Sequence, residues 1–323
     1  MDPLALTVAS VRSLNPVVRE LVLRAADGAA LPAFAAGAHI RVQVQVAGAP
    51  DWREYSLIDA NNGEDSAPTH YRIAVRRDDV GRGGSRYMHE RVKEGDVLQV
   101  QPPKNDFPLH DHAGAAVLIA GGIGVTPLVS MAARLRAQGR PVSMHYAVRD
   151  SGLLAYQDEL SALLGNNLQI HSDQQAGAPL DVAAILSRCT ADEQVYVCGP
   201  RPMLDAVLAR AVELGWPPER VHFELFAPPV VEAGDQAFEV ELAQSGQRFD
   251  VPANRSILDV LIDAGCDPMF DCKRGECGVC AVPVIDGEID HRDYVLTAGE
   301  RAAGNVIQIC VSRAKGRRLV LDL

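Results

Sequence analysis

The chain has few cysteines and lacks any long hydrophobic run. Its 7 cysteines in 323 residues are far below the density of a disulfide-stabilised secreted scaffold. It has no uncharged apolar stretch of about 18 residues, so we expect no membrane-spanning helix. The first residues, MDPLALTVASV, lack the basic start and apolar core of a signal peptide. With no export signal and an odd number of cysteines, we expect a cytoplasmic protein.

Net positive charge is also missing. The chain has 31 Lys and Arg against 42 Asp and Glu, a net charge of −11, so nucleic acid and anionic membranes are poor candidate partners. The hydrophobic fraction of 47% and the charged fraction of 23% are those of an ordinary soluble globular protein. At roughly 100–200 residues per domain, this length predicts two or three domains.

Most of the cysteines that are present follow one pattern near the C-terminus. A C-x4-C-x2-C loop and one distant partner are formed by Cys272, Cys277, Cys280 and Cys310. This is the plant-type spacing of a [2Fe–2S] cluster. Gly275 and Gly278 let the loop backbone turn towards the cluster, and we expect the fourth thiolate to arrive on a distant strand.

Zinc is the alternative occupant, because two C-x2-C pairs form many zinc sites. Here there is one such pair and no nearby His in the pattern, which favours the cluster. Cys266 lies close to the loop and is the competing ligand to exclude. Cys189 and Cys266 are interpreted as small buried hydrophobic residues.

The first third of the chain is rich in strands. Residues 40–46 alternate strictly between apolar and polar, as a half-buried strand does. Turn residues at Gly37, at 48–50 and at 61–63 separate further strands, expected at 4–11, 18–23, 71–76 and 96–101. The pattern predicts a small antiparallel β-barrel.

From about residue 113 strands alternate with helices. Strands are expected at 116–120, 142–148, 168–171 and 195–198, and helices from Pro127, at 156–164 and at 203–214. This alternation predicts an α/β domain with a parallel, doubly wound sheet.

Residues 227–234, Ala-Pro-Pro-Val-Val-Glu-Ala-Gly, have the composition of a linker. The remainder contains short strands, the cysteine loop and one helix, expected near residues 257–264. The predicted domains are therefore 1–109, 110–227 and 228–323.

Two segments of the barrel can bind a flavin. The first contains a cation for phosphate, an aromatic ring and a small hydroxyl, in Arg53, Tyr55, Ser56 and Leu57. The second is a glycine loop before a helix, whose N–H groups suit an anion, in Gly83, Gly84 and Ser85. The alternatives are a solvated strand and a flexible surface loop.

The middle domain has two further turns between a strand and a helix, where open α/β sheets bind nucleotides. The first is the glycine-rich stretch with Gly121, Gly122, Gly124, Thr126 and Pro127, in which Pro127 replaces the third glycine of the usual dinucleotide motif. The second is Cys198, Gly199 and Pro200. Each alone could be a tight turn without a ligand.

Taken together and in this order, these motifs resemble the ferredoxin–NADP reductase superfamily, and in particular the phthalate dioxygenase reductase family. The resemblance covers the whole chain, because that family joins a flavin barrel, a nicotinamide domain and a C-terminal plant-type ferredoxin of the β-grasp fold. The segment that ends in Phe226 matches the place where the family puts an aromatic ring near the flavin, and the chain ending, Leu-Val-Leu-Asp-Leu, is also similar.

The resemblance implies FMN, NADH and one [2Fe–2S] cluster as cofactors. It implies that Arg53, Tyr55 and Ser56 hold FMN, that its phosphate lies on the 83–85 loop, and that its ring edge lies along Ile73, Ala74 and Val75. FAD stays possible, since its pyrophosphate could use a similar loop. Thr126 and Cys198 are expected beside the nicotinamide.

After the strand expected at 168–171 come Ser172 and Asp173. NADPH-using relatives resemble Ser-Arg here, where the cation pairs with the 2′-phosphate. A carboxylate repels that phosphate and can accept hydrogen bonds from ribose hydroxyls, so Asp173 predicts a preference for NADH. The alternative is that Asp173 only caps a turn.

The implied acceptor is a Rieske-type non-haem iron oxygenase on another polypeptide, since this chain has no Rieske Cys and His pairs and no two-His carboxylate iron site. The resemblance thus predicts the reductase component of a multicomponent oxygenase, present as a monomer. Family habit suggests aromatic carboxylates or aryl ethers as oxygenase substrates. The alternatives are a reductase for a haem monooxygenase or a di-iron hydroxylase, or an electron-transfer module without nicotinamide activity.

Overall fold

The computed structural model describes residues 2–59, 67–226 and 232–323. The turn expected at 61–63 and the first five residues of the expected linker lie outside these ranges. The chain forms two compact units, Met1–Phe226 and Ala227–Leu323. The first unit contains two sheets, so the first two predicted domains are packed together, and the boundary at 109 stays a prediction.

The first sheet is antiparallel and has the strand order β4-β3-β6-β1-β2-β5. β4 and β5 also contact each other, which brings the two edges of the sheet together as a barrel requires. Its strands are β1 (Leu4–Asn15), β2 (Val18–Ala25), β3 (His39–Val46), β4 (Ala49–Ser56), β5 (Tyr71–Arg76) and β6 (Val97–Val100), and one helix, α1 (Gly84–Glu90), packs against β3 and β5.

The barrel core follows from the alternation in the sequence. Val42 and Val44 of β3 are fully buried, while the polar residues on either side of each, Arg41, Gln43 and Gln45, are more exposed. Pro50 was expected in a turn, but it lies within β4. β4 is the last strand in the sheet order. The N–H that Pro50 lacks is therefore not needed for a hydrogen bond to a further strand.

The second sheet is parallel, with the order β11-β10-β7-β8-β9. The chain starts at the central strand, moves outward to β9, and then returns to the other side, as in a doubly wound fold. The strands are β7 (Ala116–Gly121), β8 (Val142–Val148), β9 (Leu168–Ser172), β10 (Gln194–Cys198) and β11 (Val221–Glu224).

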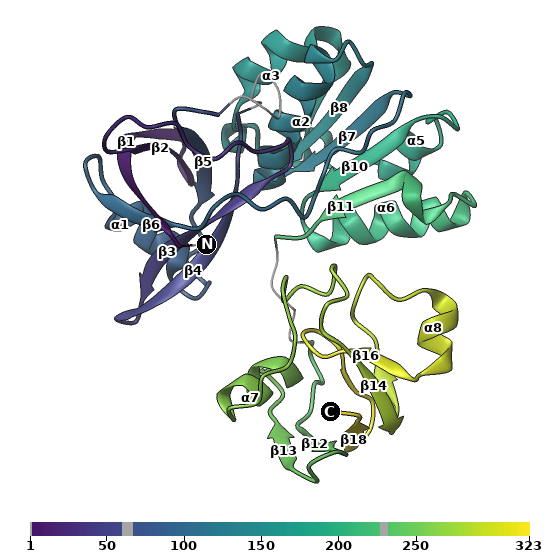
Figure 1. Ribbon diagram of the computed structural model, residues 1–323. Helices are drawn as coiled ribbons and strands as arrows, with labels where there is room; N and C mark the ends of the chain where they lie inside the picture. The colour runs from purple at the N-terminus through teal and green to yellow at the C-terminus, as the bar shows by residue number, and fades with distance from the viewer. Residues whose placement is uncertain (1, 60–66, 227–231) are drawn as a thin grey trace. The chain divides into compact units, whose positions relative to one another are not determined.

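Helices lie on both sides of this sheet (Figure 1). α2 (Val125–Ala137) and α3 (Gln157–Leu164) pack on β7 and β8 on the face that carries Leu118 and Met144. The remaining helices are α4 (Asp173–Ala176), α5 (Val182–Leu186) and α6 (Arg201–Glu213), of which α6 covers β10 and β11. The core under α2 and α3 also takes in Val18, Ile58 and Ala74 of the barrel, which has a separate core of its own, so the two sheets are packed against each other.

The second unit is built on a five-stranded mixed sheet, ordered β13-β12-β18-β14-β16. Its elements are β12 (Phe238–Leu242), β13 (Arg248–Val251), α7 (Ile257–Asp263), β14 (Ala281–Asp286), β15 (Ile289–Asp290), α8 (Ala298–Ala303), β16 (Val306–Gln308), β17 (Arg313–Ala314) and β18 (Arg318–Leu321). α7 packs into the core of the sheet through Ile257, Leu258 and Leu261. This is the β-grasp arrangement expected for the C-terminal domain.

Within the ranges that the structure describes, no helix combines the length and the hydrophobicity needed to cross a membrane.

Candidate functional site

The four cysteines of the predicted cluster come together in the second unit. The thiol of Cys310 contacts those of Cys272 and Cys280, and Cys272 also contacts Cys277. Cys277 is half-buried and the other three are buried. Cys310 was expected on a strand, but it lies in the turn that follows β16. Four soft thiolate donors on one loop and one distant turn fit an iron–sulfur cluster.

The loop backbone has the shape that the glycines were expected to permit. Gly275 has φ +80° and Gly278 has φ +77°, in the left-handed region that favours glycine. A methyl group at Gly275 would also lie 2.7 Å from a methyl carbon of Val311. The backbone N–H of Arg274 donates to Cys272 Sγ at 3.3 Å. Amide donors of this kind stabilise a negative charge on sulfur.

The pKa value of each of these four thiols depends on the other thiols that it contacts. Contact with Cys310 lowers the pKa of Cys272 to about 4 and also lowers that of Cys280. The same contacts raise the pKa of Cys310. Burial raises the pKa of Cys277 to about 11. Thiolate is thus favoured at Cys272 and Cys280, which is the state in which cysteine binds metal.

Cys266 and Cys189 are not among the predicted cluster ligands. Cys266 follows α7 and packs against the core of the second unit, while its N–H donates to Leu261. Burial raises the pKa of Cys189 to about 11. Both were expected to be buried, but both are half-buried. In the described ranges, no three His, Cys, Asp or Glu side chains are grouped as ligands of a single metal ion.

In the first unit, both nucleotide-type turns lie at the switch point of the parallel sheet. β10 and β8 flank β7 on opposite sides, and Cys198 of β10 is in register with Ala120 of β7. All these strands run parallel, but the order in which the chain adds strands reverses at β7, and such a switch point is where open α/β sheets form a crevice for ligands. The structure therefore brings together two motifs that lie far apart in the sequence.

The glycines of these turns are needed for close backbone packing. A methyl group at Gly124 would lie 2.2 Å from the carbonyl oxygen of Cys198, and one at Gly121 would lie 2.5 Å from Pro200 Cδ. Gly122 has φ +56° and open space around its α-carbon. The open side of this turn can accept a ligand, while its other glycines hold the two strand ends together.

Thr126 and Cys198 are both almost fully buried at this point. Thr126 Oγ1 donates to the carbonyl of Ile123 at 3.0 Å, which leaves its oxygen able to accept a bond from a ligand. Pro127 was expected to open the helix, but a short 3-10 turn comes first and Pro127 is the third residue of α2. A proline is still tolerated there, because N–H groups in the first turn have no partner within the helix.

The two predicted flavin segments also meet. Arg53 lies directly against the glycine loop, since a methyl group at Gly84 would be 2.5 Å from Arg53 Nε. One side of the guanidinium binds Asp51 at 2.6 Å and the carbonyl of Trp52 at 2.8 Å. Its Nη2 and the buried hydroxyl of Ser56 have no hydrogen-bond partner within the described part of the chain. Such donors, desolvated and unpaired, fit a phosphate-bearing ligand.

The glycine loop of the predicted flavin site lies at the start of a helix. Gly83 precedes α1 with φ +98°, and Gly84 and Ser85 form the first turn of that helix. Ser85 Oγ accepts from the N–H of Asp78 at 3.0 Å, so this hydroxyl closes its own loop.

Leu57 is fully buried in the barrel core, and Tyr55 of β4 packs against that core. Burial raises the pKa of Tyr55. Ile73 and Val75 point into the barrel core, whereas Ala74 packs under α2. Outside the barrel core, a flavin ring can therefore lie only against Ala74 or against the backbone of Ile73 and Val75. Phe226, the last residue described before the linker, is 38% exposed, so it is not an ordinary core aromatic residue.

At the far edge of the sheet, Asp173 begins the short helix α4 directly after β9. Its carboxylate lies 3.4 Å from His171 Nε2 and is 37% exposed. The adjacent Ser172 is buried, and its hydroxyl has no partner among the described residues. Glycine 199 and Pro200 lead into α6 near the switch point. The contact between Asp173 and a ribose stays a prediction.

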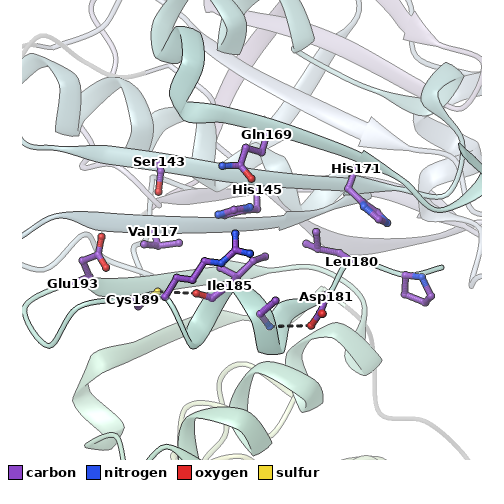
Figure 2. Close-up of a pocket in the computed structure, with 13 residues that line it drawn as sticks. Val117, Ser143, His145, Gln169, His171, Leu180, Asp181, Ile185, Cys189 and Glu193 are labelled. Carbon is purple, nitrogen blue, oxygen red and sulfur yellow. Dashed lines mark hydrogen bonds between the residues drawn. The ribbon is translucent and has the colours of Figure 1, made fainter. Parts of the chain in front are cut away.

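A pocket that the sequence did not reveal lies on the other face of the parallel sheet (Figure 2). Its volume is about 430 Å³, and its wall includes Ser143 and His145 of β8 and Gln169 and His171 of β9. Burial, with the nearby Arg188, lowers the pKa of His145. The sequence did carry one indication of this pocket: polar residues alternate with the buried Met144 and Tyr146 along β8. Such alternation indicates that one face of the strand is not covered by apolar residues.

Two family models match the chain. Residues 97–221 match the dimethylamine monooxygenase subunit DmmA-like N-terminal domain, and residues 240–315 match the 2Fe-2S iron-sulfur cluster binding domain. The second match contains all four predicted cluster cysteines and confirms the domain type expected from their spacing.

Similar proteins span the full chain. It is 41% identical over 319 residues to the heme-dependent oxidative N-demethylase beta subunit of Ectopseudomonas mendocina (strain ymp), with 98% of this chain and 97% of that protein covered. It is 40% identical over 326 residues to phthalate dioxygenase reductase of Burkholderia cepacia, with 99% and 97% covered.

Solved structures agree. One of phthalate dioxygenase reductase matches with a TM-score of 0.74 and 38% identity, covering 99% of this chain and 98% of that chain. An intact type IV self-sufficient cytochrome P450 monooxygenase matches with a TM-score of 0.71 and 35% identity. This match covers 99% of the present chain and 41% of the P450 chain.

Proposed function

The chain belongs to the phthalate dioxygenase reductase family, and on that basis we propose that it is the reductase component of a multicomponent Rieske non-haem iron oxygenase. It takes electrons from NADH, passes them through FMN to its own [2Fe–2S] cluster, and delivers them to the oxygenase. The observation that carries the proposal is the presence, in one chain, of a parallel sheet with a switch point and of a 2Fe-2S domain in which four cysteines come together.

As a member of this family, the chain is an NADH-dependent flavin iron–sulfur oxidoreductase. Its flavin supplies the chemistry that links a donor of two electrons to an acceptor of one. The protein's own task is to bind, align and shield the reacting groups.

The proposed roles follow from the geometry. Gly121, Gly122 and Gly124 shape the crevice, and Thr126 and Cys198 lie beside the nicotinamide at its buried end. No strong acid or base is required of them, since hydride moves directly once donor and acceptor atoms are held close. Asp173 accepts hydrogen bonds from the adenosine ribose.

On the flavin side, the free Nη2 of Arg53 and the hydroxyl of Ser56 supply donors. The backbone of the 83–85 loop binds the phosphate, the backbone of Ile73, Ala74 and Val75 borders the ring, and Phe226 packs near it. The four cysteines, Cys272, Cys277, Cys280 and Cys310, ligate the cluster.

A haem acceptor is the second candidate. A relative named as a heme-dependent N-demethylase beta subunit aligns along the whole chain, and a self-sufficient P450 contains a similar part. The C-terminal ferredoxin type is thus compatible with more than one kind of oxygenase. A di-iron hydroxylase is the other alternative acceptor.

The proposal includes a cytoplasmic, monomeric protein with no nucleic-acid or membrane partner. The net charge of −11 supports the last point, because both of those surfaces are anionic.

The acceptor is tested by mixing the purified holoprotein and NADH separately with a Rieske-type oxygenase, a P450 monooxygenase and cytochrome c. Anaerobic reduction of each acceptor is followed by its own absorbance. The Rieske assignment predicts that the Rieske centre is reduced fastest. Faster reduction of the P450 haem would replace the Rieske partner with the haem alternative, and cytochrome c reports whether the reductase is active at all.

A further inference from the structure

Buried hydrogen bonds join the barrel to the nicotinamide domain; one runs from Gly37 N–H to Ser130 Oγ at 3.1 Å, and another joins two side chains. Tyr156, the residue before α3, donates its hydroxyl to Glu20 Oε2 of β2 at 2.9 Å. Tyr156 is 7% exposed and Glu20 is 5% exposed. A charge-assisted bond in such surroundings is stronger than a neutral one, and its loss removes one donor from a buried carboxylate whose other oxygen binds Arg12 at 2.9 and 3.2 Å.

The backbone of Tyr156 is strained. It has φ +59° and ψ +19°, the left-handed region, which is rare for a bulky residue. Strain of this kind persists only where the surroundings hold the residue in place, and it is concentrated at functional sites. The bond to Glu20 is one such restraint. Nearby, Asn15 Nδ2 of the barrel donates to the carbonyl of Leu153 at 2.9 Å.

Charges surround the contact. Arg72 of β5 binds both carboxylate oxygens of Glu159 in α3, at 2.7 and 3.1 Å. Its guanidinium lies 5.5 Å from the centre of the Tyr156 ring and 3.7 Å from Glu20 Oε2. Burial raises the pKa of Tyr156, and the Glu20 charge adds to the effect, so the hydroxyl stays protonated and acts as the donor. We call Glu20, Arg72, Tyr156 and Glu159 the interdomain clasp.

The clasp lies between the two proposed binding sites. On the barrel side, Glu20 is in register with Ala74, and Arg72 precedes Ile73 on the strand proposed to border the flavin. On the other side, Tyr156 belongs to the segment that follows β8, and Ala147 near the end of β8 is in register with Gly121. A displacement at the clasp therefore moves one proposed site relative to the other.

We propose that Tyr156 is a positioning residue for hydride transfer: its bond to Glu20 keeps the crevice of the parallel sheet aligned with strand β5. The inference rests on the proposed function, because it assumes that a flavin and a nicotinamide bind on the two sides. Its role is geometric, because the hydroxyl of Tyr156 is directed to Glu20. The hydroxyl adds alignment that apolar packing alone does not, since packing tolerates small sliding movements and a hydrogen bond has a preferred direction.

The test uses the holoprotein with Tyr156→Phe, Glu20→Gln and the double variant. Tyr156→Phe should slow flavin reduction by saturating NADH on the order of ten- to a hundredfold, because small misalignments are costly in hydride transfer. The absorbance band of the flavin–nicotinamide complex should weaken, while flavin and iron content stay normal. The double variant should be slowed by less than the product of the two single effects, since both changes remove the same hydrogen bond, although Glu20→Gln also weakens the ion pair of Glu20 with Arg12.

A matched control is Tyr71→Phe. Tyr71 is fully buried and its hydroxyl donates to Pro32 at 2.7 Å, but both residues belong to the barrel. The same chemical change therefore occurs with no effect across the two domains. Tyr71→Phe should lower thermal stability to a similar degree without slowing flavin reduction by more than about twofold.

A readout on the apoprotein separates this inference from the proposed function. Amide hydrogen exchange in residues 153–160 should become faster in Tyr156→Phe and stay unchanged in Tyr71→Phe. If wild-type holoprotein does not oxidise NADH, the proposed function fails, whatever the exchange result. If wild type is active and Tyr156→Phe reduces its flavin within twofold of the wild-type rate, or is slowed no more than Tyr71→Phe, the positioning role is wrong.

Discussion

Gly124→Ala is the substitution that most directly tests the switch-point crevice. A methyl group at Gly124 would lie 2.2 Å from the Cys198 carbonyl oxygen, 2.5 Å from its carbonyl carbon and 2.8 Å from the nitrogen of Gly199. All three atoms are backbone, so no side chain can rotate away. Since close carbon–oxygen contacts in proteins are about 3.3 Å, the ends of β7 and β10 must separate by about 1 Å.

That separation occurs between the two strands that flank the proposed nicotinamide. A misplacement of about 1 Å can cost on the order of a hundredfold in rate, and overpacking of this kind destabilises a domain by about 1–3 kcal/mol. Stopped-flow measurement of flavin reduction by NADH should therefore show a rate about a hundredfold lower. The cluster, in the other unit, should keep its normal absorbance and iron content.

Gly152→Ala is the control in the same domain, because the nearest atom to a methyl group there is 3.4 Å away, an ordinary contact. It should leave the rate unchanged within about twofold. A folded Gly124→Ala protein that reduces its flavin within threefold of the wild-type rate would refute the assignment of the crevice to the nicotinamide.

Further predictions concern the cluster, cofactor choice, pH and the flavin. Cys310→Ser should lose the visible absorbance of the cluster while Cys266→Ser keeps it, and the reverse would make the ligand set wrong. Asp173→Arg should raise kcat/KM for NADPH relative to NADH, by on the order of a hundredfold; equal use of both by the wild type would contradict the role of Asp173. Burial lowers the pKa of His222 from 6.5 to about 4, so the unfolded chain binds this proton first and stability should fall between about pH 6.5 and 4. Thermal unfolding at pH 7 and pH 5 should show a smaller drop in Tm for His222→Gln, and an equal drop would remove His222 from the account. Acid release and chromatography should identify FMN, and FAD would overturn that assignment.

The cluster loop was predictable because metal ligation fixes both residue type and spacing. Cys272, Cys277 and Cys280 must reach one small cluster from a single loop, and the left-handed backbone of Gly275 and Gly278 confirms why glycine is required there. The crevice was predictable for a similar reason. Gly124 packs against the backbone of Cys198 so closely that only glycine fits, and such steric demands leave a visible motif.

The interdomain clasp had no such signal. Glu20, Arg72 and Tyr156 come from three separate segments, and only the fold brings them within contact distance. A charged residue on a strand is indistinguishable in sequence from one that faces solvent. By contrast, α8 did have a signal, because Thr297 and Glu300 form a capping box at its start. The helix was missed because it is short and buries none of its residues.

The polar pocket and the position of Pro50 also depend on how separate elements pack, which the sequence pattern does not show. Alternation along β8 predicts two different faces, but whether a helix covers the polar face depends on where α5 and α6 pack. Likewise, Pro50 suggests a turn by composition, and only its place on an edge strand explains why it is tolerated within β4.

The central claim, that this chain moves electrons from NADH through a flavin to its own cluster, is tested most directly by anaerobic stopped-flow spectroscopy of the purified holoprotein with NADH alone. The account predicts that flavin absorbance bleaches first and that the cluster absorbance then decreases, with no added acceptor. A flavin that stays oxidised, or a cluster that stays oxidised after the flavin is reduced, would contradict it.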